Sequence, residues 1–260
     1  MGTDRYAYLS RLRRTDPVPK LVLSMTALLA CLLCESIAVG VFTLLLMSAL
    51  CVLLGGQCPR TVLHFLKIPV AFLVIGCLTI VFRPVTETAS CLVQLRFFGR
   101  WTWGITAQYL QTGAMVFFKA MGTIAAMYFL SLNTPMTDLV LALERLHMPR
   151  LFTELMELIY RFIFVLADAA GRIHTAQESR LGYAGFRRSI DSLGLLSSMV
   201  FLRAWKRGDR VWSALESRGY TGSLKTLPQL YDRGAGLYVA AALVLLAQLA
   251  VLALERRFLI

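Results

Sequence analysis

Residues 21–54 read LVLSMTALLACLLCESIAVGVFTLLLMSALCVLL, an apolar run with a single charged residue, Glu35, near its middle. A helix needs roughly 20 apolar residues, at a rise of about 1.5 Å each, to cross the hydrocarbon core of a bilayer. The part after Glu35 has about this length and the part before it is shorter. The run therefore predicts a tight hairpin of two membrane helices, Leu21–Cys34 and Ser36–Leu54, which turns at Glu35.

Three more apolar stretches follow, at Val62–Phe82, Gln111–Leu132 and Gly236–Leu254. Hydrophobic residues make up 57% of the 260 positions, a content far above that of soluble proteins. We predict an all-α membrane protein with about five transmembrane helices and two long amphipathic helices outside the bilayer. Its domains are expected at 1–132, with about four transmembrane helices, at 133–235, which is polar, and at 236–260, the last transmembrane helix.

The distribution of positive charge predicts the orientation of these helices. Five basic residues precede the first span, namely Arg5, Arg11, Arg13, Arg14 and Lys20. Because basic flanks stay on the cytoplasmic side, the N-terminus and the polar domain 133–235 are expected in the cytoplasm and residues 83–106 outside. The formal net charge of +12 is then explained by topology and contact with the lipid bilayer, and we predict no nucleic-acid partner.

The polar domain is predicted to hold a short helix and two long ones. Pro135 ends the fourth span, and Thr137 and Asp138 are expected to cap the short helix that runs to Leu146. Apolar residues then recur at helical spacing from Pro149 to Arg180, and again from Leu193 to Leu215. Charged residues interrupt both patterns, so these two helices are expected at or below the membrane surface.

Each long helix ends in a version of one phrase, Glu-Ser-Arg-Leu-Gly-Tyr-Ala-Gly at 178–185 and Glu-Ser-Arg-Gly-Tyr-Thr-Gly at 216–222. A glycine that ends the helix in a left-handed turn and an arginine in the last turn are ordinary capping features. Capping requires neither the glutamate nor the tyrosine, so the repetition predicts two matched tips for two matched sockets on a soluble partner. The candidate interface residues are Arg180, Arg218, Glu178, Glu216, Ser179, Ser217, Gly182, Gly219, Tyr183 and Tyr220.

The motifs of common catalytic sites are missing from the sequence. There is no G-x-x-x-x-G-K-[ST] loop for ATP phosphates, no H-E-x-x-H and no G-x-S-x-G. The three histidines are scattered, and the pair Cys31 and Cys34 lacks a second pair at zinc spacing. We therefore predict no catalytic residue, no metal site and no cofactor bound by this chain.

Lys119 lies near the middle of the fourth span, where an ammonium group is costly in lipid, and this makes it a functional candidate. It is expected to contact another membrane subunit or a carboxylate such as Glu87, unless it reaches the membrane surface along a tilted helix. The small residues of the same span predict that another helix approaches it closely; they are Gly113, Gly122, Ala125 and Ala126.

Several phrases together resemble the T component of energy-coupling-factor transporters, and they are most similar to its cobalt-type member. They are Thr134-Pro135-Met136-Thr137-Asp138-Leu139, Leu146-His147-Met148-Pro149-Arg150, Tyr160-Arg161-Phe162 and the two Glu-Ser-Arg phrases. In this family the first motif often reads Ala-Arg-Gly, whereas here the glycine comes one place later, at Gly182.

The resemblance implies a scaffold that couples ATP hydrolysis by other subunits to transport. By position, Arg180 and Arg218 would dock on two ABC-type ATPase subunits, which hold ATP and Mg²⁺. The membrane helices would embrace a substrate-binding S component, with Lys119, Thr134, Pro135 and Arg161 as residues of that interface or of the structure. The expected location is the plasma membrane of a bacterium or archaeon, and the expected cargo is cobalt or nickel.

Three alternatives remain at this stage. The chain could be the T component of a vitamin-specific or shared module, because specificity in this architecture resides in another subunit. A self-sufficient metal permease would use Cys31, Cys34, Cys51 and His64, whose spacing is irregular. A membrane enzyme of lipid metabolism is disfavoured, since the acidic residues form no D-x-x-D-type cluster.

Overall fold

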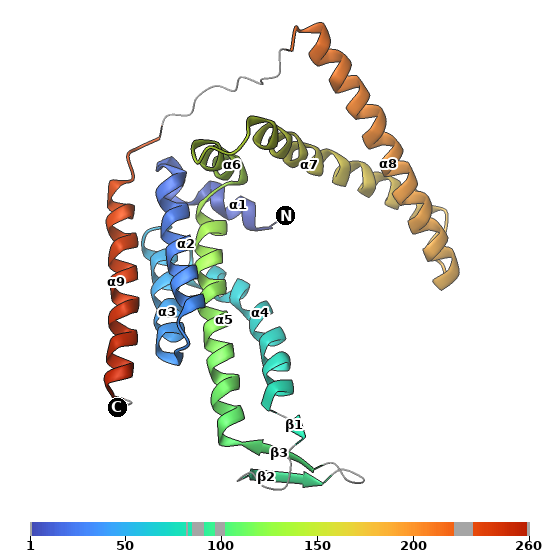
Figure 1. Cartoon of the computed structure of the whole chain (residues 1–260). Helices are drawn as coiled ribbons and strands as arrows, with labels where there is room; N and C mark the ends of the chain where they lie inside the picture. Colours follow the sequence, from blue (N-terminus) through green and yellow to red (C-terminus); the bar gives the residue numbers. More distant parts are fainter. Residues whose placement is uncertain (1, 82, 85–90, 97–101, 221–230, 259–260) are drawn as a thin grey trace. The chain divides into compact units, whose positions relative to one another are not determined.

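The computed structural model describes residues 2–81, 83–84, 91–96, 102–220 and 231–258. The chain forms two compact units, one made of Met1–Ala142 and Leu230–Ile260 and the other of Leu143–Gln229. Figure 1 shows the order of their elements. Thr221 and Gly222 of the second phrase, and Glu87, lie outside the described residues.

The first unit is built from helices. Their bounds are α1 Gly2–Leu9, the 3₁₀ turn η1 Arg11–Arg14, α2 Pro17–Leu33, α3 Ile37–Leu53, α4 Pro59–Val81, α5 Ala107–Asn133, α6 Met136–Arg145 and α9 Ala235–Phe258. The hairpin predicted around Glu35 is confirmed, since α2 ends at Leu33 and α3 begins at Ile37. Side chains define both starts: Asp16 accepts from the Val18 N–H at 3.1 Å and Ser36 from the Val39 N–H at 3.2 Å.

The helices confirm an all-α membrane protein. Three of them, α4, α5 and α9, are long and apolar enough to span a bilayer. The two helices of the hairpin, α2 and α3, are apolar but only 17 residues long, at the lower limit of a spanning helix.

A small antiparallel sheet joins α4 to α5, where sequence analysis predicted only a loop. Its strands are β1 Arg83–Pro84, β2 Cys91–Arg96 and β3 Thr102–Thr106, in the order β1-β3-β2. Gln94 pairs with Gly104 and Leu95 with Trp103. The segments Cys-Leu-Val-Gln-Leu-Arg and Thr-Trp-Gly-Ile-Thr carry aromatic and branched residues of high β propensity, which is the local signal for these strands.

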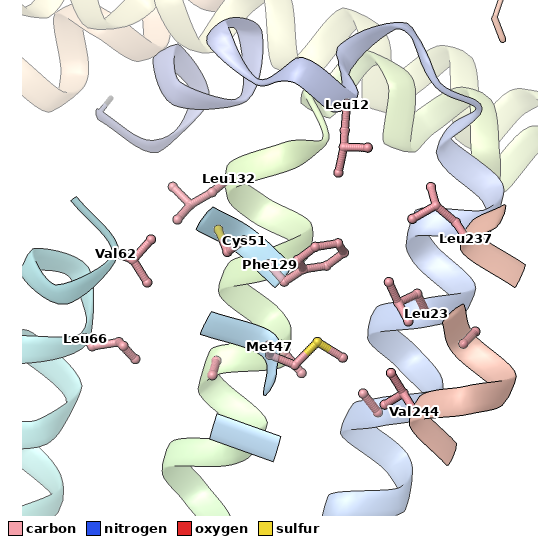
Figure 2. Packing of buried hydrophobic residues seen from close by; sticks show 14 of the residues in the cluster. Leu12, Leu23, Met47, Cys51, Val62, Leu66, Phe129, Leu132, Leu237 and Val244 are labelled. Carbon is pink, nitrogen blue, oxygen red and sulfur yellow. The ribbon is translucent and has the colours of Figure 1, made fainter. Parts of the chain in front are cut away.

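The core of the first unit lies among α2, α3, α5 and α9. Figure 2 shows Phe129 of α5 above Met47 of α3, with Leu23 of α2 and Val244 of α9 on one side and Leu132 of α5 on the other. One polar side chain ties the same helices together. Gln248 of α9 is fully buried and donates from Nε2 to Ala27 O at 3.1 Å and to Thr43 Oγ1 at 2.8 Å. Packing and these hydrogen bonds thus join the last helix to the first hairpin.

The helices α3 and α5 approach each other closely in backbone at Gly40 and Gly122. A Cβ at Gly40 would lie 2.7 Å from the carbonyl carbon and oxygen of Phe118, and a Cβ at Gly122 would lie 2.8 Å from Gly40 O. The small residues of the fourth span do admit another helix, as predicted, and at Gly122 that helix is α3 of the same chain. Gly113 lies similarly close to Val81 at the end of α4.

A buried polar junction surrounds the end of α5. Lys20 is fully buried and its Nζ donates to Leu12 O at 2.9 Å and to Asn133 O at 3.5 Å. The Asn133 side chain accepts a hydrogen bond from Ser10 Oγ at 2.8 Å. Lys20, which we interpreted as one of the basic residues flanking a membrane span, is therefore also a structural centre that joins the N-terminal segment to α5.

The turn from α5 into α6 belongs to the same junction. The prediction that Thr137 and Asp138 cap α6 is wrong, because the helix begins at Met136 and the Pro135 carbonyl accepts its first hydrogen bonds. Asp138 is instead buried and accepts from the Tyr231 hydroxyl at 3.0 Å. The segment at Tyr231 returns from the second unit, and Asp232 pairs with Thr15 in a parallel bridge.

The second unit consists mainly of the two long helices that were predicted, α7 Arg150–Ser179 and α8 Phe186–Ser217. At 30 and 32 residues they are about 45 and 48 Å long. The helix α8 begins earlier than its apolar pattern suggested, since Arg187, Arg188 and Ser189 make its first turn mostly polar. Many large apolar side chains are exposed on both, including Leu151, Phe152, Leu155, Ile159, Ile163, Phe201 and Trp205.

Candidate docking surface

The two arginine-bearing tips lie at opposite ends of α8, one in the turn from α7 and one after its last residue. Arg180 and Arg218 occupy the same position, directly after the last helical residue. At the first tip the Gly182 N–H donates to Gln177 O and the Leu181 N–H to Glu178 O, both at 2.9 Å. This is the hydrogen-bond pair of the Schellman motif.

The second tip closes with the same pair of bonds. The Tyr220 N–H donates to Leu215 O at 3.0 Å and the Gly219 N–H to Glu216 O at 3.0 Å. The two helix ends thus have the same backbone hydrogen bonds from the glutamate through the arginine and for two residues beyond it. Leu181 corresponds to Gly219 in this alignment, and Gly182 to Tyr220.

This alignment explains why the glycine of the first phrase comes one place late. The prediction that glycine takes the left-handed position is right for Gly219, with φ of 70°, and wrong for the first tip, where Leu181 takes it with φ of 58°. Gly182 has another role. A Cβ there would lie 2.8 Å from Ser192 Oγ and 2.9 Å from Gln177 O, so the position must stay small for the turn to pack on α8.

The strain at Leu181 gives a stability prediction. Leu181→Gly is expected to stabilise the second unit by about 1 kcal/mol, because a left-handed conformation costs an L-residue roughly that much and the leucine side chain is 69% exposed. Hydrogen exchange of the α7 and α8 amides measures the change. The same substitution at Leu195, also exposed but in the middle of α8, should instead weaken protection by about 1 kcal/mol. Equal loss in both variants would contradict strain at Leu181.

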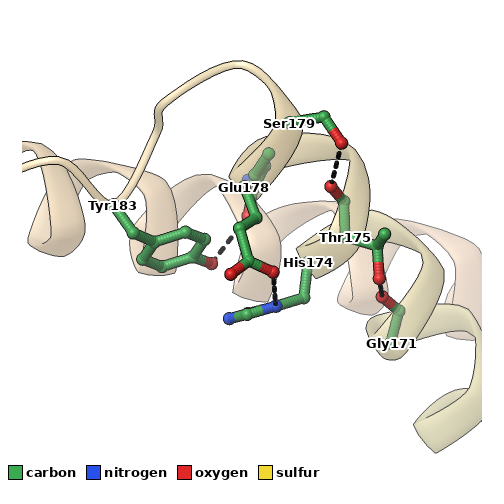
Figure 3. A network of polar contacts seen from close by, with 7 residues as sticks. Gly171, His174, Thr175, Glu178, Ser179 and Tyr183 are labelled. Atoms are coloured by element: carbon green, nitrogen blue, oxygen red, sulfur yellow. Dashed lines mark hydrogen bonds and ion pairs between the residues drawn. The ribbon is translucent and has the colours of Figure 1, made fainter.

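Side chains hold the first tip to its own helix and to α8, as Figure 3 shows in part. The His174 ring stacks on Tyr183 with centroids 4.5 Å apart, and the Tyr183 hydroxyl donates to Gln177 Oε1 at 2.8 Å. Gln177 Nε2 in turn donates to Ser192 O at 3.1 Å. Glu178 lies 3.9 Å from His174 in a weak, exposed contact. The tyrosine of this phrase therefore stabilises the turn.

The second tip is tied to the beginning of α7. The Tyr220 hydroxyl donates to Glu154 Oε2 at 2.9 Å, and the Tyr220 ring meets Trp212 edge to face at 6.4 Å. The hydrogen bond to Glu154, together with desolvation and the carboxylate charge, raises the pKa of Tyr220 because each disfavours the phenolate. Tyr220 therefore stays a neutral donor at physiological pH.

The two arginines remain available to a partner. Arg180 and Arg218 are exposed, and neither forms an ion pair with any residue that the structure describes. Ser179 and Ser217 bond back to carbonyls of their own helices at 2.9 and 2.8 Å. Exposed guanidinium groups on rigid helix ends are suited to grip carboxylates, which the planar fork can hold with two hydrogen bonds.

The other four candidate residues have different surroundings. Thr134 is 6% exposed and Pro135 is fully buried at the turn from α5 to α6, which favours a structural role for both. Lys119 is half-buried on α5, and its backbone carbonyl accepts from Thr123 Oγ1 at 2.8 Å. Arg161 is exposed on α7. No single site gathers these residues within either unit.

The candidate metal ligands are also dispersed. Cys51 Sγ accepts from Asn133 Nδ2 at 3.6 Å, Cys31 Sγ lies 3.6 Å from Lys119 O, and His64 is exposed. Among the residues that the structure describes, no three His, Cys, Asp or Glu side chains form a group that could hold a metal ion. The arrangement therefore offers no support for ion binding by these cysteines.

Comparison with known proteins identifies a family that matches most of this chain. Residues 10–229 match the family model CbiQ, described as cobalt transport protein. The chain is 30% identical over 221 residues to the cobalt transport protein CbiQ of Salmonella typhimurium, covering 85% of this chain and 97% of that protein. It is 29% identical over 225 residues to the uncharacterized protein MJ1089 of Methanocaldococcus jannaschii, covering 86% and 82%.

A longer relative joins a similar segment to another one. The chain is 30% identical over 226 residues to a putative fused cobalt transport protein CbiMQ of Methanocorpusculum labreanum. The match covers 87% of this chain but only 37% of that protein. The chain thus spans little more than a third of the fused relative.

Proposed function

Because this chain belongs to the CbiQ family of cobalt transport proteins, we propose that it is the transmembrane coupling subunit of an ATP-driven cobalt importer of the energy-coupling-factor type. It would dock two ABC-type ATPase subunits through its two tips and hold a substrate-binding S component in the membrane. ATP-driven closure of the ATPases would move the tips, and the long helices would pass that motion to the S component.

The observation that carries this proposal is the pair of matched tips. Both end in the same hydrogen-bonded turn and both present an exposed arginine directly after the helix, at the two ends of one helix about 48 Å long. A partner with two equal binding sites accounts for such a pair, whereas helix capping alone requires no matching sequence. An ATPase dimer has two equal subunits, and the chain has no P-loop of its own.

The remaining parts of the chain agree with this role. Several apolar helices place the first unit in a membrane, and the exposed apolar side chains of α7 and α8 offer contact area to a membrane-embedded partner. The fused relative joins a CbiQ-like segment to a further segment named CbiM, which supports a membrane partner in cobalt transport. We place the N-terminus and the second unit in the cytoplasm, on the side of the ATPases and of the basic residues.

Affinity purification of the tagged chain from native membranes tests the proposal. We expect an ABC-type ATPase and a small membrane protein to co-purify in a mild detergent and to be identified by mass spectrometry. The companion membrane protein should bind Co²⁺, and a vitamin-binding companion would instead support the alternative T component. Recovery of the chain alone, together with Co²⁺ uptake by the purified chain in liposomes without ATP, would contradict the proposal in favour of a permease.

A further inference from the structure

The repetition between the two tips extends two helical turns further back than the shared Glu-Ser-Arg. Residues 172–180 read RIHTAQESR and residues 210–218 read RVWSALESR. Five of nine positions are identical, namely the first arginine, the alanine, the glutamate, the serine and the last arginine. The other four pair Ile with Val, His with Trp, Thr with Ser and Gln with Leu.

The local structure repeats along with the sequence. The hydroxyl at the fourth position bonds to the carbonyl four residues earlier in both copies, Thr175 to Gly171 O and Ser213 to Asp209 O, each at 3.0 Å. The aromatic ring at the third position contacts a tyrosine beyond each arginine, although the geometry differs: His174 stacks on Tyr183 at 4.5 Å, and Trp212 meets Tyr220 edge to face at 6.4 Å. The repeat is therefore a structural unit of nine residues and its turn.

These internal contacts leave one face of the unit without a structural role. The first arginine, the alanine and the last arginine follow each other at i, i+4 and i+8, so Arg172, Ala176 and Arg180 share a helix face, as do Arg210, Ala214 and Arg218. All six are exposed. Because the helix dipole acts mainly within the last turn, it does not explain an arginine two turns earlier.

A cavity of 570 Å³ borders this face on α7. Arg172 and Arg180 line it from α7, and Leu195, Met199 and Arg203 line it from α8. Arg172 forms an ion pair with Asp168 at 2.9 Å, but both side chains are about two-thirds exposed and such a pair is weak. In the described part of the chain Arg203, like Arg180, has no ion-pair partner. The first face thus borders a hollow that three arginines line together with apolar side chains.

We propose that each ATPase subunit is held by a two-arginine face, Arg172–Ala176–Arg180 at the first tip and Arg210–Ala214–Arg218 at the second. This inference rests on the proposed function. Each face takes two carboxylates of the partner that lie about 12 Å apart, the rise of eight helical residues. The alanine between the arginines lets the partner surface approach the helix, and the guanidinium forks bind carboxylates with two hydrogen bonds each.

The repeat indicates which kind of molecule binds the two-arginine faces. Two equal subunits would each present the same acidic surface. A nine-residue sequence that occurs twice in this chain offers one matching face to each of them. An anionic bilayer surface needs only positive charge and requires no repeated order of arginine, alanine and arginine. The partner of the two-arginine faces is therefore expected to be protein, with acidic residues in both copies of its socket.

The dissociation rate of the ATPase from the immobilised full-length chain tests the two-arginine faces. Arg172→Glu and Arg210→Glu are each expected to raise this rate at least tenfold, because loss of a charge pair at an interface acts mainly on dissociation. Ala176→Trp should do the same by blocking close approach. Arg233→Glu is the control, since Arg233 is an exposed arginine of the first unit, just before α9 and outside the repeat, and its rate should stay within about twofold.

The outcomes separate this inference from the proposed function. If the wild-type chain retains no ATPase, the proposed function itself fails. If Arg180→Glu releases the ATPase while Arg172→Glu, Arg210→Glu and Ala176→Trp all behave like Arg233→Glu, the tips dock and the two-arginine faces are wrong.

A photo-crosslinking amino acid at position 176 or 214 then identifies the partner surface. Crosslinks to ATPase peptides with two acidic residues support the faces. Crosslinks only to phospholipid would overturn them.

Discussion

The double variant Arg180→Glu with Arg218→Glu is expected to lose bound ATPase almost completely, by a factor of about 100 or more in affinity. Loss of one partner of a charge pair within an interface costs about 2–5 kcal/mol, and a tenfold change corresponds to about 1.4 kcal/mol. Both arginines are exposed and lie after the last residue of a helix, so the helices of the first unit should fold unchanged. Co-purification with the ATPase, read by quantitative mass spectrometry, measures the loss.

Two further variants separate docking from helix stability. A glutamate in the last turn opposes the helix dipole by up to about 1 kcal/mol, so the double variant with glutamine is needed beside it. Glutamine removes the charge without opposing the dipole and should still weaken ATPase binding at least tenfold. The small membrane companion should stay bound in all variants. Full retention of the ATPase by the glutamate variant would show that both arginines act only as helix caps.

The second large effect is expected inside the first unit, where Gly40→Ala should destabilise the helix bundle by about 1–3 kcal/mol, the usual range for an overpacked site. A Cβ at this position would lie 2.7–2.9 Å from backbone atoms of Phe118 and Lys119, so α3 and α5 must separate to admit it. Backbone atoms of a helix cannot rotate away as side chains do. Unfolding of the purified chain in mixed micelles, followed by circular dichroism, measures the change.

The same substitution at Gly76 is the control. Gly76 lies within α4 and a Cβ there meets no atom within 4 Å. Alanine is a better helix former than glycine, so Gly76→Ala should stabilise by up to about 1 kcal/mol. The two changes therefore have opposite expected signs. If Gly40→Ala also stabilised the bundle, the close approach of α3 and α5 at this residue would be wrong.

Hydropathy and repetition predicted most of the fold. Apolar length located the helices, and Glu35 located the turn of the hairpin, because a charge and a serine cap interrupt an apolar run visibly. The phrases at Arg180 and Arg218 predicted two similar helix ends, and the hydrogen bonds of the two turns agree. The docking role of these residues stays a prediction.

The features that the sequence did not predict have physical causes. The burial of Lys20 depends on acceptors from Leu12 and Asn133, one of them more than a hundred residues away in sequence, so no local pattern can indicate it. Leu181 takes a conformation that favours glycine because the neighbouring Gly182 is needed against Ser192. The repeat from Arg172 and from Arg210 is present in the sequence, but four of its nine positions are replaced, so it is a weaker signal than the shared Glu-Ser-Arg.

The position of α9 has a consequence for how the chain is made. This helix is synthesised after α7 and α8, yet its Gln248 supplies hydrogen bonds to α2 and α3, which leave the ribosome before those two helices. Residues 134–234 must be translated in between, which takes about 5–20 s at 5–20 residues per second. During that time the hairpin of α2 and α3 lies in the bilayer without α9, and Thr43 and the Ala27 carbonyl lack the hydrogen bonds from Gln248. The membrane unit can therefore be completed only after the whole of α7 and α8 has been synthesised.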